Sequence, residues 1–310
     1  MKELESKKYW IWLSLVKGLG NISKQKLLKI YKTPEKIYKL TKKQLLQIPE
    51  IGINRAQNIL DTKTRSIVNN HIYEMKRRNI DIISVYDKEY PKILKEIYDF
   101  PISLYVKGNK DILNNISIAI VGCRECSEYG KEVAKYFSYN LANSNINIVS
   151  GLAKGIDSYA HIGALSACGK TVAVVGHGLD SMYPIQNKTL FEEIISKKGT
   201  IISEYPLGVK PNKINFPARN RIISGMTKGI IVVEAKKKSG TLITVDFALE
   251  QGREVYVVPG NINSINSFGT NDLIKQGAKM VTNYKEIEIW VSIKNGKAVS
   301  LAKIFCNKNF

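Results

Sequence analysis

The segment Ser117–Gly130 joins a buried-strand pattern to residue types that bind anions. Its apolar run Ile118–Val121 ends at Gly122, and a helical pattern begins near Ser127. Such a strand–turn–helix unit points backbone N–H groups and the positive end of a helix dipole at an anion above the sheet. Arg124 adds a guanidinium group two residues after the glycine. The segment therefore predicts the floor of a phosphate-binding site.

Glycine-bearing loops follow three other strand-like runs, and one of these loops carries a lysine. They are Ser150–Gly155 with Gly151 and Lys154, Gly176–Gly178, and Ser239–Thr241 with Gly240. Glycine permits close approach of a ligand to the backbone. Ligands of parallel sheets bind beyond the carboxyl ends of the strands, so these loops are expected to meet the Arg124 turn at one edge of a sheet.

The elements that must position these loops alternate from residue 117 to about residue 284. Strand-like runs occupy 118–122, 146–150, 171–176, 200–204, 229–234, 254–258 and 278–281. Helical stretches between them include 128–143, 156–168, 187–198, 217–227 and 240–251. This alternation predicts an α/β, Rossmann-like fold, in which helices cover both faces of a doubly wound, mostly parallel sheet.

Residues 1–78 show a different pattern, of short helices joined by tight turns. The turns VKGLG (16–20) and IPEIG (48–52) each precede a helix that opens with polar and basic residues. This resembles a tandem helix-hairpin-helix or SAM-like unit, whose hairpins present N–H groups to DNA phosphates. Glu50 stands where that motif usually has glycine. Two interpretations stay open, a DNA-binding unit and a packing module that contacts no DNA.

The remaining segments complete the expected domain organisation. Residues 79–285 are expected to form the Rossmann-like domain, which begins with short strands at Ile82–Val85 and Ser103–Val106. Residues 286–310 are polar and basic, and we expect a short tail that is too small for another domain. A chain of 310 residues is long enough for one large and one smaller domain.

The charge of the chain favours a polyanionic partner. The net charge is +20 and the pI is near 9.6, and residues 1–80 hold 18 basic and 6 acidic side chains. A coding bias toward Lys, Asn and Ile is the alternative explanation of this basicity.

The cysteines and the hydropathy profile predict a reduced, cytoplasmic protein without metal. Cys123 and Cys126 form one CxxC pair, but no second pair or suitably spaced histidine completes a zinc site. Free thiols without a leader sequence indicate a reducing compartment. No apolar stretch has the length of a membrane span, so no membrane association is expected.

Two glycine patterns imitate nucleotide-binding loops without the required context. Residues 164–171 fit a relaxed P-loop, but a helix precedes them and a strand follows, so Gly169 is interpreted as the end of a helix. Residues 176–181 lack the third glycine of a dinucleotide fingerprint, and Pro184 prevents a helix directly behind them. No cofactor is therefore expected. Asp157 and His161, four residues apart, are interpreted as an ion pair rather than as a catalytic pair.

Longer motifs recur in a fixed order along nearly the whole chain. They are VGCR (121–124) with SEYG (127–130), SGLAKGID (150–157) with AH (160–161), GLDSMYPIQN (178–187), SEYPLG (203–208), FPARNRIISG (216–225), VEA (233–235) with SGTLIT (239–244), and VPG (258–260). This series resembles the DNA processing protein A family (DprA, also called Smf) of bacterial transformation and recombination. Many members end in a winged-helix domain, for which residues 286–310 are too few.

The resemblance implies a non-catalytic protein that binds and protects single-stranded DNA and loads the RecA recombinase onto it. It also implies a homodimer formed through the Rossmann-like domain. The nucleic-acid-binding residues are then expected to be Gly122, Arg124, Ser127, Gly151, Lys154, Asn187, Lys188, Phe191, Arg219, Arg221 and Gly240, without catalytic or metal-binding residues.

Within this set, Arg124 is suited to grip a phosphate with two parallel hydrogen bonds. Gly122 and Gly151 are expected to leave backbone N–H groups uncovered for neighbouring phosphates. Lys188 lies at the start of a helix, where its charge and the helix dipole act together.

Five members of the set have a second interpretation. Lys188 is alternatively a solvated surface charge, and for Lys154 both a phosphate contact and a surface charge stay open. Phe191, one turn after Lys188, is placed either to stack on an unpaired base or to pack in the core. For Arg219 and Arg221, a salt bridge to Glu204 or Glu234 is favoured over a phosphate contact.

A competing interpretation comes from a different class, the nucleoside-monophosphate phosphoribohydrolases. The stretch Glu234…Ser239-Gly240-Thr241…Glu250 is similar to their phosphate loop and acidic residue. Those enzymes typically have a paired-glycine loop, which is Lys238-Ser239-Gly240 here, and they lack the segment 219–225. Release of adenine from AMP would favour this alternative.

Overall fold

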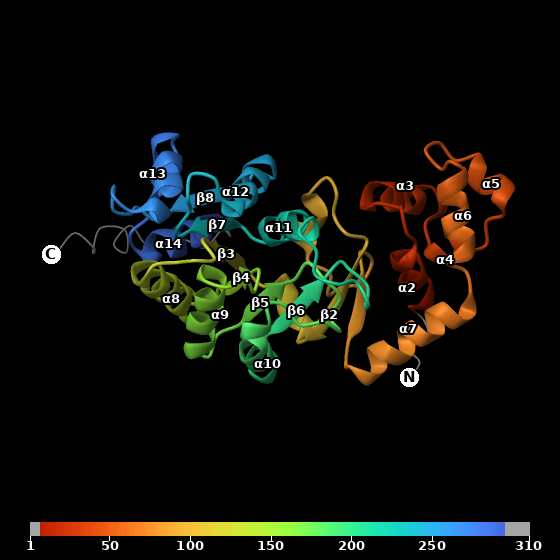
Figure 1. The fold of residues 1–310 in the computed structure, drawn as a ribbon, viewed down its shortest axis with the longest axis horizontal. Coiled ribbons are helices and arrows are strands. Elements are labelled where there is room, and N and C mark those ends of the chain that lie inside the picture. Colours follow the sequence, from red (N-terminus) through yellow and green to blue (C-terminus); the bar gives the residue numbers. More distant parts are fainter. Residues whose placement is uncertain (1–6, 295–310) are drawn as a thin grey trace.

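A computed structural model describes residues 7–294 (Figure 1). In this part of the chain the N-terminal region is helical and forms one end of the molecule. Its helices are α2 (Lys8–Leu15), α3 (Asn21–Tyr31), α4 (Pro34–Tyr38), α5 (Lys42–Leu46), α6 (Ile53–Asp61) and α7 (Arg65–Arg77). The expected boundary after residue 78 falls between α7 and the first strand.

The two tight turns of the helical region have the same backbone conformation. Gly18 has a φ of +70° and Glu50 a φ of +73°, so the second turn reaches the left-handed region without glycine. Each turn is contacted by the helix that follows the other turn. Asn58 of α6 donates to the Lys17 carbonyl at 3.2 Å, and Lys26 of α3 pairs with Glu50 at 2.5 Å. The two halves therefore pack reciprocally, as a tandem hairpin unit requires.

The rest of the described chain is built on one nine-stranded sheet. Its strands are β1 (Asp81–Ser84), β2 (Ser103–Gly108), β3 (Ser117–Val121), β4 (Asn147–Ser150), β5 (Thr171–Val174), β6 (Thr200–Ser203), β7 (Gly229–Val232), β8 (Glu254–Val257) and β9 (Lys279–Met280), in the order β1-β2-β6-β5-β4-β3-β7-β8-β9. The β1–β2 and β2–β6 pairs are antiparallel and the other pairs are parallel. The predicted Rossmann-like, mostly parallel sheet is confirmed.

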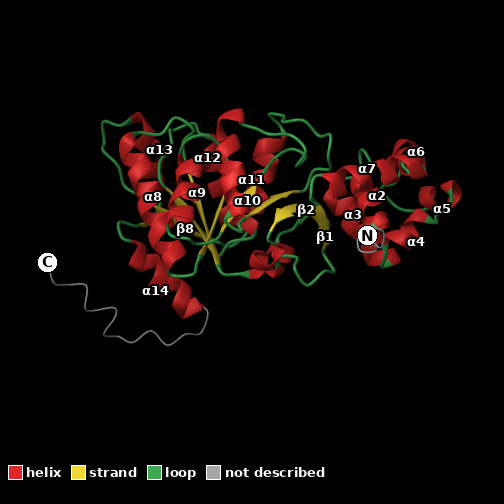
Figure 2. Ribbon diagram, turned by 90° about the horizontal axis from the view of Figure 1, so that it is seen from below, coloured by secondary structure: helices red, strands yellow, loops and turns green. Residues whose placement is uncertain are grey.

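Helices cover both faces of this sheet (Figures 1 and 2). On one face lie α8 (Glu128–Asn143), α9 (Ile156–Ser166), α10 (Lys188–Ser196) and α14 (Tyr284–Lys294); on the other lie α11 (Asn215–Gly225) and α12 (Gly240–Glu250), with α13 (Phe268–Lys275) beyond them. Short 3₁₀ helices occupy Lys92–Glu96, Lys110–Asn114, Ile185–Asn187 and Ile265–Ser267. Alternating side chains of β3 serve the two cores, with Ile118 and Ile120 facing α8 and α9, and Ala119 and Val121 facing α11 and α12.

The winding of the sheet reverses between β3 and β7. From β3 the chain moves outward through β4, β5 and β6, and then returns through α11 to place β7 on the other side of β3. Loops that leave neighbouring strands in opposite directions open a crevice at such a switch point. The fold thus places a ligand site at the carboxyl ends of β3 and β7.

The helical region packs against the β2 and β6 side of the sheet. Ser14 and Tyr105 share a hydrogen bond of 2.6 Å, Asn21 donates to Glu204 at 2.8 Å, and Gln25 donates to the Phe100 carbonyl at 2.7 Å. These contacts surround an apolar cluster to which both regions contribute.

The expected tail from residue 286 begins within α14 in the structure. Ile287 and Val291 are buried in the core beneath α8, and the Trp290 ring lies 5.8 Å from that of Tyr256. The proposed boundary at 285 therefore cuts a helix, and residues 295–310 of the expected tail lie outside the described residues. Within residues 7–294, no helix combines the length and the apolar character needed to cross a membrane.

Candidate nucleic-acid interface

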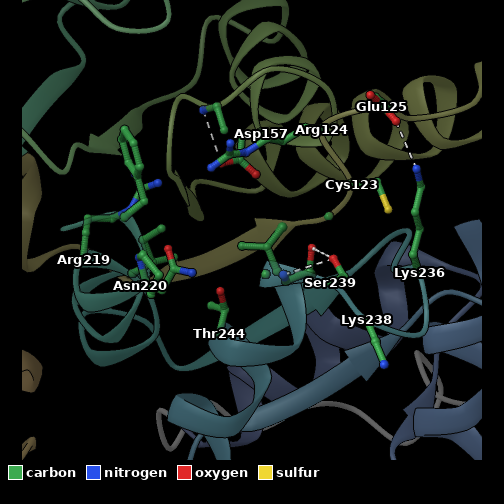
Figure 3. Close-up of a pocket in the computed structure, with 18 residues that line it drawn as sticks. Cys123, Arg124, Glu125, Asp157, Arg219, Asn220, Lys236, Lys238, Ser239 and Thr244 are labelled. Carbon is green, nitrogen blue, oxygen red and sulfur yellow. Dashed lines mark hydrogen bonds and ion pairs between the residues drawn. The ribbon is translucent and has the colours of Figure 1, made fainter. Parts of the chain in front are cut away.

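A pocket of about 460 Å³ occupies the switch-point crevice (Figure 3). Its walls come from the loop after β3, the start of α9, helix α11 and the loop from β7 into α12; they include Gly122, Arg124, Glu125, Asp157, Phe216, Arg219, Asn220, Lys236, Lys238, Ser239, Gly240 and Thr244. A smaller cavity of about 50 Å³ adjoins it and shares Arg124, Ala153, Phe216 and Arg219 with it. Gly151, Lys154 and Tyr183 line this smaller cavity.

The crevice has an excess of positive charge. Four basic side chains line the larger pocket with two acidic ones, and Lys154 adds another cation at the smaller cavity. Lys236 is paired with Glu125 at 3.0 Å. Arg124, Lys154 and Lys238 are exposed and have no carboxylate partner within residues 7–294. Cations without partners in a concave site attract a polyanion.

The turn that carries Arg124 is locked to the start of α9. The Ile156 N–H donates to the Cys123 carbonyl at 3.1 Å. Gly155 has a φ of +79°, and a Cβ on it would lie 2.3 Å from the Cys123 carbonyl oxygen. A Cβ on Gly122 would lie 2.6 Å from Ile156 Cγ1, so this glycine is explained by packing of α9. The loops bearing Arg124 and Lys154 therefore form one interlocked unit.

Arg219 and Asp157 form the buried floor of the crevice. The Arg219 guanidinium is 4% exposed and donates to the carbonyls of Gly151, at 2.6 Å, and Val174. Asp157 accepts from the N–H groups of Gly151 at 3.1 Å and Ala153 at 3.4 Å. Burial lowers the pKa of Arg219 to about 10 and raises the pKa of Asp157, while each charge partly offsets this effect on the other.

This floor corrects two expectations. The Gly151 N–H is bonded to Asp157 and is not left uncovered for a phosphate. A Cβ on Gly151 would lie 2.6 Å from both Arg219 and Asp157, so the glycine makes room for this pair. Arg219 contacts neither Glu204 nor Glu234, and its position beneath the crevice replaces the expected salt bridge.

Arg221, two residues after Arg219, belongs to a separate ion network. Its guanidinium donates to both carboxylate oxygens of Glu204 at 2.7 Å and, through Nε, to Asp99 at 2.7 Å. The favoured interpretation as a salt bridge to Glu204 is confirmed. The Asp99 contact had no signal in the sequence, because Asp99 lies 122 residues away.

Ser127 and Asn187 lie outside the Arg124 pocket and bond to the protein itself. Ser127 caps α8 by accepting from the Gly130 N–H at 3.0 Å, and its hydroxyl donates to Glu234 at 2.5 Å. Asn187 is buried and donates to the Leu152 carbonyl at 2.9 Å. Their polar groups hold helix α8 and the loop after β4, and their contacts with nucleic acid stay a prediction.

Phe191 and Lys188 also differ from the expected arrangement. Phe191 is only 6% exposed and packs in the apolar cluster shared with the helical region, so core packing accounts for its ring. Lys188 is exposed at the start of α10 and does not line either cavity. The two cavities are lined by the loops after β3, β4, β5 and β7 together with α11, and a contact of Lys188 with nucleic acid stays a prediction.

Several residues of the crevice have no role in the sequence interpretation. Phe216 lines both cavities, with the Arg124 guanidinium 5.6 Å from its ring centroid. The Tyr183 and Phe216 rings are stacked, with centroids 5.3 Å apart and planes at 27°. Lys236 and Lys238 precede the glycine loop at Gly240. This lysine run beside a glycine turn was the sequence signal that could have identified them as site residues.

The expected ion pair between Asp157 and His161 does not form. The Thr171 hydroxyl donates to the Ile148 carbonyl at 2.8 Å, so the His161 Nδ1–H must be the donor in its 2.7 Å contact with Thr171. The Nε2 atom is then unprotonated, and it is buried without a hydrogen-bond partner among the described residues. Burial, followed by the charge of Arg219, lowers the pKa of His161 to about 3.

We expect this histidine to make the fold sensitive to acid. The unfolded chain takes up a proton on His161 below about pH 6.5, whereas the folded chain does so only near pH 3, so stability is lost as the pH falls between these values. Lowering the pH from 7 to 5 should reduce the free energy of unfolding by about 2 kcal/mol through this residue. Urea denaturation at both pH values measures it. His161→Gln should show a smaller loss, and an equal loss in both proteins would contradict the assignment.

The carboxylates of the phosphoribohydrolase interpretation are not brought together. Glu234 is 2% exposed and accepts from the Ser127 N–H at 3.0 Å and from its hydroxyl. Glu250 is exposed at the far end of α12 from the pocket. Neither Glu234 nor Glu250 therefore lines the crevice.

Residues 164–171, which fit a relaxed P-loop pattern, have the wrong order of elements for a phosphate-binding loop. Helix α9 precedes Gly169 and β5 follows it, the reverse of the P-loop order.

Cys123 is buried, Cys126 is half-buried and Cys168 is exposed, all as free thiols, while Cys306 lies outside the described residues. Between residues 7 and 294, no group of three His, Cys, Asp or Glu side chains is arranged to hold a metal ion.

Comparison with known sequences places this chain among DNA-processing proteins. The family model described as DNA recombination-mediator protein A matches residues 81–291. DNA processing protein DprA of Streptococcus pneumoniae is 42% identical over 275 residues, which are 82% of this chain and 97% of the relative. Protein Smf of Escherichia coli is 40% identical over 243 residues, 78% of this chain and 65% of the relative.

Solved structures agree with this result. The crystal structure of DNA processing protein A from S. pneumoniae superposes with a TM-score of 0.79 at 38% identity, covering 91% of this chain and 97% of that one. DNA processing protein A from Helicobacter pylori, described for its single-stranded DNA binding mode, gives a TM-score of 0.62 at 29% identity. The superposition covers 70% of this chain and 96% of the H. pylori chain.

Proposed function

The chain belongs to the DNA recombination-mediator protein A (DprA/Smf) family, and from this membership we propose that it binds single-stranded DNA along the switch-point crevice. One observation carries the proposal: Arg124, Lys154 and Lys238 gather there without carboxylate partners in the described chain. Phosphate contacts of this kind hold the backbone and are independent of base sequence. The single-stranded DNA binding of the H. pylori relative supports the choice of ligand.

The biological role follows from the family. We propose that the chain protects exposed single strands and loads RecA onto them during transformation and recombination, as a cytoplasmic homodimer joined through the sheet domain. The family description as a recombination mediator supports this role. A non-catalytic mode of action is supported by the engagement of both carboxylates that line the pocket, since Glu125 is paired with Lys236 and Asp157 lies beside Arg219.

The domain organisation is part of the same proposal. Residues 1–78 would act as the helical domain and residues 79–285, together with the rest of α14, as the DNA-binding domain.

The direct test measures binding of fluorescent oligo(dT) of about 20 nucleotides between about 50 and 200 mM salt. Three or four phosphate contacts predict a slope of log K against log salt of about −2 to −3. A duplex of equal length should compete weakly, because an unpaired strand presents its bases without the cost of opening pairs. Salt-independent binding, or a preference for duplex, would contradict the proposal.

Two further assays test the loading of RecA and the phosphoribohydrolase alternative. RecA filament formation on a single strand should be faster in the presence of the chain than in its absence. Incubation with AMP should release no adenine, and base release would favour the phosphoribohydrolase interpretation instead.

A further inference from the structure

An aromatic pair stands beside the cations of the crevice. Tyr183 precedes the 3₁₀ helix Ile185–Asn187, and Phe216 lies in the first turn of α11, yet their rings are stacked with centroids 5.3 Å apart. Phe216 is half-buried and lines both cavities. Tyr183 lines only the smaller cavity and its side chain is 43% exposed. The pair therefore has one supported ring and one ring open to solvent.

The inner ring is held from several directions. Gly176 lies directly behind Phe216, since a Cβ on this glycine would be 3.2 Å from the Phe216 Cδ1 atom. The Arg124 guanidinium lies 5.6 Å from the centroid of the same ring. On the outer side, the His177 Nε2 atom is 3.3 Å from the Tyr183 carbonyl oxygen. The Tyr183 ring thus stacks on a ring that is itself packed against Gly176 and Arg124.

Core packing does not account for the exposed ring. Phe191, by comparison, is 6% exposed and is fully explained by its apolar neighbours. Tyr183 instead presents a large apolar surface next to Lys154 and Arg124, which line the same small cavity. An aromatic face beside cations is the arrangement by which proteins hold unpaired nucleotides, since every base has a face that stacks.

We propose that the outer face of Tyr183 stacks on one unpaired base of the bound strand, while Arg124 and Lys154 contact the phosphates that flank it. This inference rests on the proposed binding of single-stranded DNA and adds the position of a base. It assigns to Tyr183 the part of the binding affinity that depends on the bases of the DNA. It assigns to the two cations the part that depends only on the DNA backbone.

The experiment compares two probes of equal length and charge. One is oligo(dT), and the other is the same backbone with tetrahydrofuran abasic residues throughout. Tyr183→Ala should weaken binding of oligo(dT) by about 5- to 150-fold. Its affinity for the abasic strand and the slope with salt should equal those of the wild type. Tyr183→Phe, which keeps the ring, should bind both probes as the wild type does.

Tyr139→Ala is the matched control, because Tyr139 is 45% exposed on α8 and lines neither cavity. It should change neither affinity. Equal losses of Tyr183→Ala on both probes would overturn the inference, because they would show an effect on the phosphate site or on folding. Unchanged binding of oligo(dT) would overturn it as well. If the proposed DNA binding itself is wrong, the wild type will bind neither probe, and this result distinguishes that failure from failure of the Tyr183 inference.

Discussion

Replacing both Arg124 and Lys154 with alanine should weaken binding of single-stranded DNA at least about 100-fold. Each side chain is expected to make a charge-assisted hydrogen bond to a phosphate, with a net contribution of about 1.5–3 kcal/mol. The slope of log K against log salt should become shallower by about 1.4, since two phosphate contacts are lost. Both quantities come from one titration of fluorescent oligo(dT) over a series of salt concentrations.

The matched control removes two lysines at the opposite ends of the strands from the crevice. Lys170 and Lys228 directly precede β5 and β7, so they lie at the amino ends of these strands, and their double alanine variant has the same net charge. It should bind as the wild type does. If both double variants lose affinity equally, total charge explains binding and the crevice is not the site.

The abasic probe separates this prediction from the one made for Tyr183. The Arg124 and Lys154 double variant should lose affinity for the abasic strand and for oligo(dT) by the same factor, because its lost contacts are to phosphates. A loss confined to oligo(dT) would place Arg124 or Lys154 against a base instead.

Arg221→Leu should lower the free energy of unfolding by about 3–5 kcal/mol, because it leaves the Glu204 carboxylate, whose side chain is only 10% exposed, without its ion-pair partner. Asn21 also donates to Glu204, so the change reaches the contact between α3 and the sheet domain. The melting temperature should fall by about 6–20 °C. Urea denaturation followed by circular dichroism measures the loss.

Two variants test the cause of this loss. Arg221→Leu combined with Glu204→Gln should recover part of the stability, since the unpaired negative charge is removed while the acceptor for Asn21 remains. Arg77→Leu removes only an exposed pair with Glu74 and should change the midpoint little. Folded Arg221→Leu should retain the affinity of the wild type for oligo(dT). A stable variant with weakened binding would instead make Arg221 a DNA contact.

The secondary structure followed from local patterns, for a reason visible in particular elements. The run at 118–121 is buried on both faces, so every residue in it is apolar, and the helix predicted at 128–143 has the bounds of α8. Helix α13 was not predicted, because its eight residues include Gly269 and Thr270 and no extended apolar stripe. Helix α14 was taken for tail because only Ile287 and Val291 of its described residues are buried.

The sequence by itself determined the edge of the sheet at which the crevice opens. Parallel strands place all their carboxyl ends on one side, so strand–glycine–helix order is enough to bring the Arg124 turn and the loops at Gly151 and Gly240 together. The repeated alternation of strands and helices was likewise sufficient for the fold class.

Only the tertiary structure decided which polar side chains at that edge face the ligand and which face the protein. Arg219 and Arg221 are two residues apart on one helix, yet one lies beneath the crevice and the other is held by Glu204 and Asp99. The partners of such groups lie tens to more than a hundred residues away in the chain, and a buried charge takes whichever partner the packing brings to it. No local pattern contains that information, because it arises when distant segments meet.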